Sequence, residues 1–380
     1  MKIIIVGMIN SIHLARWIKH LHKFKKIEVY IFPVFPENSH PILRNISSIN
    51  SKYSNIKIIK LFSWEKLNTF FFKILKFFFD DNFLIKWLNY NINKLKPKYI
   101  HSHELTTSSI LCMHSKSSYQ GKYPKWIVTN WGSDLFFFFK RKKFKNNLKK
   151  ILKYSNFYTA ECQRDFLLAR KIGSKAQFLD CILNSGGVDL KFTTKLRQKK
   201  LTSLRKVIII KGYQGLFGLA LNSIKALEKI HKELKDYKIV IYSADNLVIN
   251  YCKTIRNKLH LEIYSNKDYL SERKIYNLFA KSKIYIGLSK SDGVSTSLIE
   301  SMALGAFPIQ SDTSCAKEWI VNNKSGFIVK PDDISQISKK ILFVLNNNKF
   351  INYAASINKK TIAKKADSNK VKMQIRSIYL

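Results

Sequence analysis

The sequence predicts an α/β protein with two doubly wound domains, each built on a sheet of parallel strands. The first observation is the length of 380 residues, which accommodates two domains of ordinary size. The second is a recurrence of short apolar runs with helix-like segments between them, which is typical of parallel sheets covered by helices. The third is a polar, basic stretch at 191–206, where this alternation lapses before a new strand begins.

Strands are expected where the apolar runs are short and continuous, because strands of a parallel sheet are buried on both faces. Such runs lie at 2–7, 28–34, 99–103, 126–132, 207–212, 238–243, 261–265, 284–289 and 307–311. Helices are expected between several of them, at 219–234 and 271–280. We place the domain boundary in the polar stretch, which gives domains at 1–195 and 196–360. The basic tail at 361–380 is a candidate helix that packs back on the N-terminal domain.

The chain is strongly basic, with 67 Lys and Arg against 25 Asp and Glu and a formal net charge of +42. Such an excess favours polyanions as partners, whether nucleic acid, an anionic lipid surface or phosphorylated substrates. Lys, Asn, Ile, Phe and Tyr are abundant throughout, so a purely compositional origin of the charge stays open as well.

No segment of the sequence predicts a membrane span, a signal peptide or a metal site. The longest apolar region, 70–87, is interrupted by Lys and Asp, and the N-terminal apolar run is too short for a signal sequence. The five cysteines have neither a CxxC spacing nor a nearby histidine pattern. We therefore expect a cytoplasmic protein without a bound metal.

The stretch SKSDGVSTSLIESMALGAFPIQSD, at 289–312, carries the chemistry. It predicts a loop, a helix and a strand, following the strand at 284–289. Ser295, Thr296 or Ser297 can cap the helix, and the N–H groups at its start then suit an anion.

Two carboxylates lie in this stretch. Glu300 falls about one turn into the helix, where a carboxylate suits a ribose diol better than a phosphate. Asp292 lies in the preceding loop and suits a second polyol, such as a sugar ring, while Gly293 allows close approach of the backbone. The alternative is a solvated helix face with a capping loop.

The run DGVSTSLIESMALGAFPI, at 292–309, resembles the E-x7-E region of retaining GT-B glycosyltransferases of the GT4 type, and the resemblance continues through 311–333. It implies a GT-B fold, in which two Rossmann-like domains face a cleft, and sugar transfer from a nucleotide donor with retention at the anomeric carbon. It also implies that Glu300 holds the ribose and that Asp292, where Glu is usual, contacts the donor sugar. Such enzymes need no metal and no cofactor besides the nucleotide-sugar co-substrate. The residues expected to bind it are Glu300, Lys211, Gly212, Gly215, Gly293, Val294, Ser295, Thr296 and Ser297.

One part of the resemblance departs from the family pattern. Family members carry an Arg and a Lys after the first strand of the second domain, and these cations neutralise the donor phosphates. Tyr213 and Gly218 occupy those positions here. Three explanations stay open: Lys211 and glycine backbone N–H groups substitute, the site is impaired, or the donor has one phosphate.

The N-terminal half resembles the same family more loosely. YIHSH, at 99–103, resembles a strand that ends in His-x-His, which implies that His103, with His101 second, faces the transferred sugar as a catalytic group beside Asp292. The stretches 7–17 and 128–135 occupy two further strand ends. The residues expected on the acceptor side are Asn10, Ser11, His13, Trp131, Gly132, Ser133 and Asp134.

Two aromatic and basic stretches, 69–87 and 135–150, suggest the acceptor. Cations beside aromatic residues suit anionic lipid headgroups. We expect a peripheral enzyme at the cytoplasmic face of the inner membrane that extends a lipid-linked or cell-surface glycan in polysaccharide biosynthesis of the cell envelope. Alternatively, the phenylalanines belong to the core, which we favour for 69–87 but not for 135–150.

Three other functions remain as alternatives. A catalytically inactive GT-B-like scaffold fits the missing Arg and Lys. A nucleic-acid binder fits the charge, although no RNA-recognition or helix-turn-helix module is found in the sequence. A nucleotide-sugar epimerase would use the same donor without an acceptor.

Overall fold

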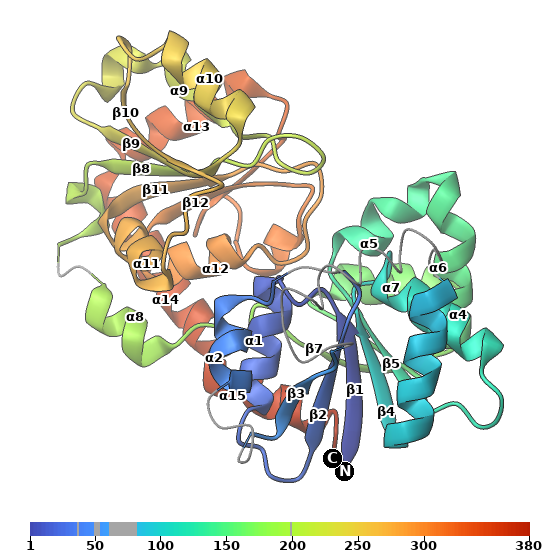
Figure 1. Cartoon of the computed structure of the whole chain (residues 1–380). Helices are drawn as coiled ribbons and strands as arrows, with labels where there is room; N and C mark the ends of the chain where they lie inside the picture. The colour runs from blue at the N-terminus through green and yellow to red at the C-terminus, as the bar shows by residue number, and fades with distance from the viewer. Residues whose placement is uncertain (36–37, 49–53, 61–81, 198–199) are drawn as a thin grey trace. The chain divides into compact units, whose positions relative to one another are not determined.

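The computed structural model describes residues 1–35, 38–48, 54–60, 82–197 and 200–380 (Figure 1). The part of the aromatic stretch at 69–81 lies outside these residues. The chain divides into two compact units, Met1–Gly186 with Lys370–Leu380, and Gly187–Asn369. Each unit contains one parallel sheet, so the predicted pair of α/β domains is confirmed.

The described residues of the first unit form a seven-stranded sheet in the order β3-β2-β1-β4-β5-β6-β7. All neighbouring strands are parallel. The central strands are buried on both faces, which explains their continuous apolar sequences. The strands are β1 (Lys2–Gly7), β2 (Glu28–Pro33), β3 (Ile56–Ile58), β4 (Tyr99–His103), β5 (Lys125–Asn130), β6 (Phe157–Ala160) and β7 (Gln177–Cys181).

Helices cover both faces of this sheet. Residues of α4 and α6 join one apolar core with Ile4, Ile100 and Val128. Trp17 of α1 and the penultimate residue Tyr379 contact the opposite face, where both rings lie beside His101 of β4. The helices are α1 (Ile12–Leu21), α2 (Pro41–Ser48), α4 (Ser108–Ser118), α5 (Ser133–Phe136), α6 (Lys142–Tyr154) and α7 (Gln163–Ile172), with the short 3-10 helix η1 (Phe138–Lys140) and the end of α15 (Ser368–Ser377).

The second unit has a six-stranded parallel sheet in the order β10-β9-β8-β11-β12-β13. Both sheets therefore follow the doubly wound order 3-2-1-4-5-6, in which the chain reverses direction across the sheet between its first and fourth strands. The strands are β8 (Val207–Lys211), β9 (Lys238–Ala244), β10 (His260–Ser265), β11 (Ser282–Gly287), β12 (Phe307–Ser311) and β13 (Phe327–Val329).

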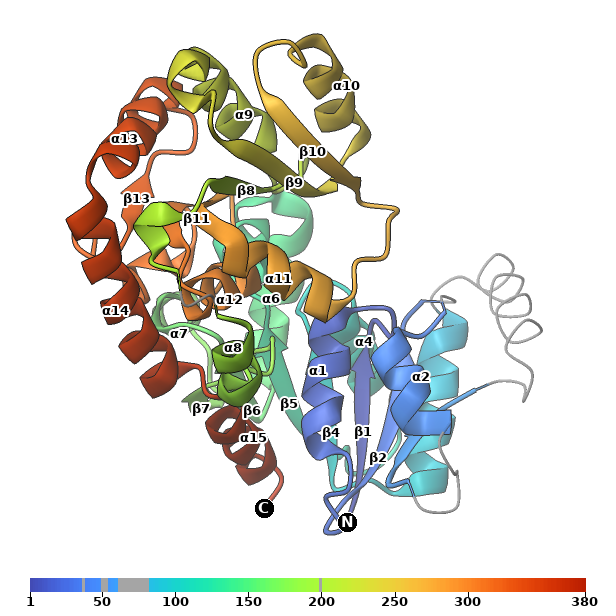
Figure 2. The same ribbon diagram turned by 90° about the vertical axis from the view of Figure 1, so that its left-hand side faces the viewer.

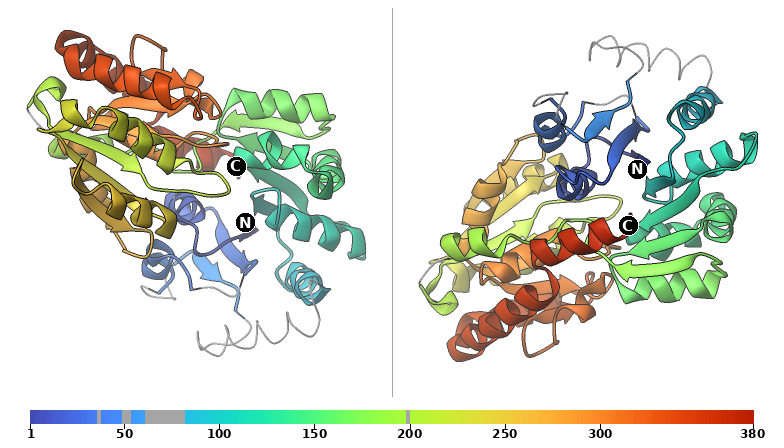
Figure 3. Two further views of the ribbon diagram at one scale, coloured as in Figure 1. Left: turned by 90° about the horizontal axis from the view of Figure 1, so that it is seen from above. Right: turned by 90° about the horizontal axis from the view of Figure 1, so that it is seen from below.

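The second sheet also lies between two layers of helices. Seen from above, α9, α10 and α13 cover one face (Figure 3), and α11, α12 and α14 lie on the other (Figures 1 and 2). The helices are α8 (Leu190–Leu196), α9 (Ala220–Lys229), α10 (Asn246–Thr254), α11 (Glu272–Lys281), α12 (Thr296–Ala303), α13 (Ile334–Asn346) and α14 (Asn348–Lys365), with the 3-10 helices η2 (Thr202–Leu204), η3 (His231–Leu234) and η4 (Cys315–Glu318).

The unit boundary lies at Gly186/Gly187, before the polar stretch in which the sequence placed it. Helix α8, inside that stretch, belongs to the second unit because the ring of Phe192 packs 5.7 Å from the ring of Tyr276 on α11. At the other end of the chain, Lys370–Leu380 returns to the first unit, where the guanidinium of Arg376 donates to the carbonyl oxygen of His20 over 2.9 Å. Among the described residues, no helix combines the length and apolarity needed to cross a membrane.

Candidate functional site

The predicted donor residues lie at the carboxyl edge of the second sheet. Strands β8 and β11 are neighbours there, and they are the first and fourth strands of the doubly wound order. In such sheets, ligands bind outside the carboxyl ends of the strands at this switch point. Lys211 is the last residue of β8, and the loop with Asp292 follows β11.

Helix α12 begins directly after that loop. Ser295 is its N-cap residue, but its side chain makes no capping hydrogen bond. The hydroxyl of Ser297 instead accepts a hydrogen bond of 2.7 Å from the Tyr242 hydroxyl on β9. The predicted hydroxyl cap is therefore not formed, and backbone N–H groups at the helix start are left to an anion or to water.

The other end of α12 is held by a buried arginine. The guanidinium of Arg205 donates to the carbonyl oxygens of Leu304 (3.0 Å) and Ser282 (3.1 Å). A cation at a helix C-terminus complements the helix dipole. Arg205 thus fixes the end of α12 opposite to the predicted anion site.

Glu300 is buried on α12, with 5% of its surface exposed. Its Oε1 accepts a hydrogen bond of 3.2 Å from the hydroxyl of Tyr276 on α11. A solvated helix face, the alternative reading of this segment, is therefore wrong at Glu300. A buried carboxylate with a hydrogen-bond donor beside it is suited to orientation of a diol.

Lys211 lies in the field of both carboxylates. Burial alone would lower the pKa of Lys211. Asp292 has the largest opposing effect, followed by Tyr213, Tyr285 and Glu300, and the net shift of the pKa is upward. The ammonium lies 4.6 Å from the centroid of the Tyr213 ring. Lys211 is therefore a charged group at the switch point, with a cation–π contact that limits its motion.

The segment 212–219, which we call the glycine loop, connects β8 to α9. A Cβ atom at Gly218 would lie 2.1 Å from the carbonyl oxygen of Tyr213, so only glycine fits there. Gly215 has a φ of +129° at the open tip of the loop. The loop pairs with the segment after β11, because Leu219 N donates to Leu288 O (3.1 Å) and Lys290 N donates to Phe217 O (2.6 Å).

In the first unit, His101 is a structural residue. Its Nε2 is 2.6 Å from Thr129 Oγ1, and its Nδ1 is 2.5 Å from the hydroxyl oxygen of Tyr379. The indole N–H of Trp17 donates to the same hydroxyl oxygen over 3.3 Å. Both nitrogens are occupied within the fold, so we withdraw His101 as a group that faces the sugar.

His103 differs from His101 in its contacts. It is fully buried, and neither ring nitrogen has a hydrogen-bond partner among the described residues. The ring packs edge-on against Trp17, with centroids 4.8 Å apart. Burial, and then the neighbouring His13, lower the pKa of His103 to about 3, so the imidazole is neutral at physiological pH. A buried imidazole without a partner is an available donor and acceptor at the end of β4.

The remaining residues predicted on the acceptor side divide into two groups. His13 and Trp131 lie together, with ring centroids 5.4 Å apart, at the carboxyl ends of β1 and β5. Ser11 instead caps α1 by accepting from His13 N over 3.2 Å. Asn10 is exposed beside it, and Gly132 is the N-cap residue of α5, with a φ of +78°.

Asp134 braces two loops and does not present its carboxylate to a ligand. Its Oδ2 accepts from the backbone N–H groups of Leu105 (3.0 Å) and Trp131 (2.9 Å). The neighbouring Glu104 accepts from Thr106, Thr107 and Ser108 and thereby caps α4. Burial, and then the Glu104 charge, raise the pKa of Asp134 to about 8. The prediction that Asp134 lines the acceptor side is therefore wrong. Its neighbour Ser133 is the first residue of α5.

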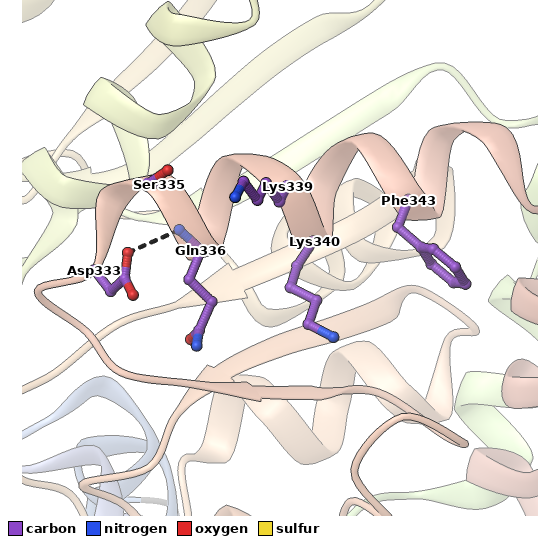
Figure 4. Close-up of a pocket in the computed structure, with 6 residues that line it drawn as sticks. All are labelled: Asp333, Ser335, Gln336, Lys339, Lys340 and Phe343. Atoms are coloured by element: carbon purple, nitrogen blue, oxygen red, sulfur yellow. Dashed lines mark hydrogen bonds between the residues drawn. The ribbon is translucent and has the colours of Figure 1, made fainter.

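A hollow on the outer side of α13 contains none of the predicted residues (Figure 4). Its side chains come from one helix and its cap, where Asp333 accepts from Gln336 N over 2.8 Å. We assign no function to this hollow.

Part of the second unit is similar to a known protein family. Residues 219–363, less than half of the chain, match the family described as glycosyl transferases group 1. The chain carries a glycosyl transferases group 1 domain. Asp292 and Glu300 both lie within this domain, whereas Lys211 precedes it.

Similarity over the whole chain is lower. An uncharacterized glycosyltransferase of Methanocaldococcus jannaschii is 23% identical over 367 residues, which cover 88% of this chain and 85% of the relative. The solved structure of sucrose-phosphate synthase from Thermosynechococcus elongatus superimposes with a TM-score of 0.71 at 12% identity, over 100% of this chain and 98% of that one. Anabaena HepE in complex with UDP-glucose gives 0.69 at 12% identity, over 100% and 99%. The fold around the glycosyl transferases group 1 domain is therefore GT-B.

Sequence reasoning missed two residues on the donor side of the second unit, Tyr276 and Lys290, and one residue of the first unit, Trp17. Tyr276 lies on a predicted helix, but nothing in the sequence pairs it with Glu300. Trp17, on α1, packs its ring against the ring of His103. Lys290 lies inside the motif itself, and its place beside the glycine loop depends on the pairing of two distant segments.

Proposed function

We propose that the protein is a retaining glycosyltransferase of the GT4 type, which moves a sugar from a nucleotide-sugar donor to a glycan acceptor. The observation that carries the proposal is the group around the start of α12. The ammonium of Lys211, at the end of β8 at the switch point, lies in the field of two carboxylates, Asp292 and Glu300, and both carboxylates lie within the residues that match glycosyl transferases group 1.

Each residue of this group has a role that follows from its chemistry. Glu300 accepts hydrogen bonds from the ribose hydroxyls, and Asp292 accepts from hydroxyls of the donor sugar. The start of α12 and Lys211 stabilise negative charge on the phosphate as it leaves. The backbone at Gly212, Gly215, Gly293 and Val294 and the hydroxyls of Ser295, Thr296 and Ser297 complete the donor side.

In the proposed reaction, the bond between the anomeric carbon and the phosphate oxygen breaks, and its electron pair leaves with the phosphate. An acceptor hydroxyl oxygen forms the new bond on the same face of the sugar. The leaving phosphate takes the hydroxyl proton, so no side-chain nucleophile and no metal is required. His103, which is neutral and has no hydrogen-bond partner among the described residues, donates a hydrogen bond to a sugar hydroxyl near the reacting carbon. Asn10, His13, Trp131 and Gly132 belong to the acceptor side.

Calorimetric titration with UDP, GDP, CMP and ADP tests the proposal. One structural neighbour holds UDP-glucose, so UDP is the first ligand to try. We expect one nucleotide to bind to the wild type and to lose most of its affinity in Glu300→Gln, which preserves the size of the side chain. Addition of EDTA should leave binding unchanged. Absence of binding by all four nucleotides would instead favour an inactive scaffold.

The acceptor that we propose is a lipid-linked or cell-surface glycan of the cell envelope, at the cytoplasmic face of the inner membrane. Support comes from the stretch 140–153, which contains eight Lys and Arg and no Asp or Glu. We call it the lysine patch. The phenylalanines before it are only partly exposed, since Phe138 and Phe139 pack against the core of the first unit. Cations cover them; the Arg141 guanidinium lies 4.4 Å from the Phe137 ring centroid. The membrane contact that we propose is therefore electrostatic.

A further inference from the structure

The donor site contains more negative than positive charge if Lys211 is its only cation. Lys211 is one positive charge in the field of two carboxylates, Asp292 and Glu300. A nucleoside diphosphate would add further negative charge at the same place. A second cation is needed beside the dipole of α12, because buried or half-buried like charges repel strongly.

Lys290 meets this requirement. It follows β11, two residues before Asp292, and its side chain is exposed. Its Nζ donates to the carbonyl oxygen of Gly215 over 3.3 Å, so the ammonium lies at the tip of the glycine loop. The backbone holds it there, because the Lys290 N–H donates to Phe217 O over 2.6 Å and Gly218 pairs with Ser289.

The glycine loop is tied by hydrogen bonds near both ends, and its residues include no Lys or Arg. Gln214 N donates to Asp245 Oδ2 over 2.6 Å, and Ala220 N donates to Tyr213 O over 3.1 Å, so both ends of the loop are fixed. Lys211 lies at its first end and Lys290 contacts its tip. Lys211, at the end of β8, and Lys290, after β11, therefore both lie beside the glycine loop.

We infer that Lys211 and Lys290 together form a phosphate clamp, with Lys211 as the inner and Lys290 as the outer cation. This inference rests on the proposed function for its natural ligand, the phosphates of a nucleotide-sugar. Tyr213 and Gly218 occupy the positions of the family's Arg and Lys and carry no positive charge. In the clamp, lysines at two strand ends supply that positive charge instead. The clamp also indicates a sugar donor with a diphosphate and not a monophosphate, because two cations match the negative charge of two phosphates.

The test compares a nucleoside with its monophosphate and diphosphate. We expect Lys290→Met to weaken diphosphate binding roughly tenfold, the value of one charge-assisted hydrogen bond, and to leave nucleoside binding unchanged. Because Lys290 is exposed, the variant should fold. Lys229→Met, on the exposed end of α9, is the matched control. Equal affinity of wild type and Lys290→Met for the diphosphate would overturn the clamp, and so would an equal loss for nucleoside and diphosphate.

Inorganic pyrophosphate separates the clamp from the proposed function. Pyrophosphate needs neither the ribose contact of Glu300 nor the sugar contact of Asp292. We expect wild-type protein to bind it at low salt, and Lys290→Met and Lys211→Met each to bind it more weakly. If pyrophosphate binds in this way and no nucleotide does, the clamp stands and the glycosyltransferase proposal fails. If nucleotides bind through Glu300 and both lysine variants bind pyrophosphate like the wild type, the clamp fails alone.

Discussion

The hydroxyl of Tyr276 donates a hydrogen bond of 3.2 Å to Oε1 of Glu300 in the interior of the second unit. Tyr276 lies on α11 and Glu300 on α12, and both side chains are buried. The bond fixes one carboxylate oxygen of Glu300. Glu300 is therefore held in one orientation before any ligand arrives.

We expect Tyr276→Phe to weaken nucleotide binding by roughly fivefold, because a single hydrogen bond contributes about 1 kcal/mol. Calorimetric titration with the nucleotide that binds the wild type measures the change. Tyr264→Phe is a suitable control, since Tyr264 also donates to a carboxylate, Glu262, but on the edge strand β10. Unchanged affinity in Tyr276→Phe would show that Glu300 needs no support from α11.

The two histidines of β4 should respond differently to the same substitution. His101→Leu leaves the hydroxyls of Thr129 and Tyr379 buried without His101, and each unsatisfied group costs about 1–3 kcal/mol of folding free energy. His103→Leu removes no hydrogen bond within the described fold. We expect His101→Leu to lower the free energy of unfolding and His103→Leu to lower the transfer rate while stability stays near that of the wild type. Chemical denaturation and product formation measure the two effects, and equal stability losses would contradict the assignment.

The central strands could be predicted from the sequence because both faces of a parallel sheet are apolar. All nine runs that we identified are strands in the structure. Among the described residues, four strands were missed, namely β3, β6, β7 and β13. Strands β3 and β13 have three residues each, and β7 is an edge strand with exposed polar positions, so none of these shows a continuous apolar run.

The candidate site was predictable where one segment contains it and not where several segments meet. The loop and helix from Asp292 to Glu300 were identified from one continuous segment, by its strand–loop–helix pattern and its resemblance to the E-x7-E region. His101 and His103 have the same sequence context, so only the contacts of Tyr379, 278 residues away from His101, distinguish them. Asp134 was misassigned because burial beside Glu104, and not its position after a strand, decides its role.

Asp134 should make the stability of the first unit depend on pH. Burial raises its folded-state pKa to about 8, whereas an unfolded Asp titrates near pH ~3.9. The folded state therefore binds the proton more tightly, and its stabilisation is complete below the unfolded pKa and is lost as pH rises to about 8. We expect the free energy of unfolding to fall across this range by at most about 1.4 kcal/mol per pH unit, and to fall less steeply in Asp134→Asn.

Denaturant titrations at several pH values between 5 and 9 measure this dependence. Tryptophan fluorescence reports mainly on the first unit, since five of the six tryptophans precede Gly186. Asp180→Asn, at an exposed position of the same unit, is the control. Identical pH slopes for the wild type and Asp134→Asn would show that Asp134 is ionised in the folded protein.

The lysine patch should bind anionic vesicles more strongly than lysines elsewhere on the chain. We expect the wild type to sediment with vesicles that contain anionic lipid, to be released by salt, and to stay in solution with neutral vesicles. A variant with Lys142, Lys143, Lys149 and Lys150 changed to Gln should lose most of this binding. The control variant changes Lys339, Lys349, Lys359 and Lys360, on α13 and α14, and removes the same charge. An equal loss in both variants would mean that net charge, and not the patch, drives association. If the wild type ignores anionic vesicles but binds RNA or DNA with a steep salt dependence, the partner is nucleic acid and the membrane proposal is wrong.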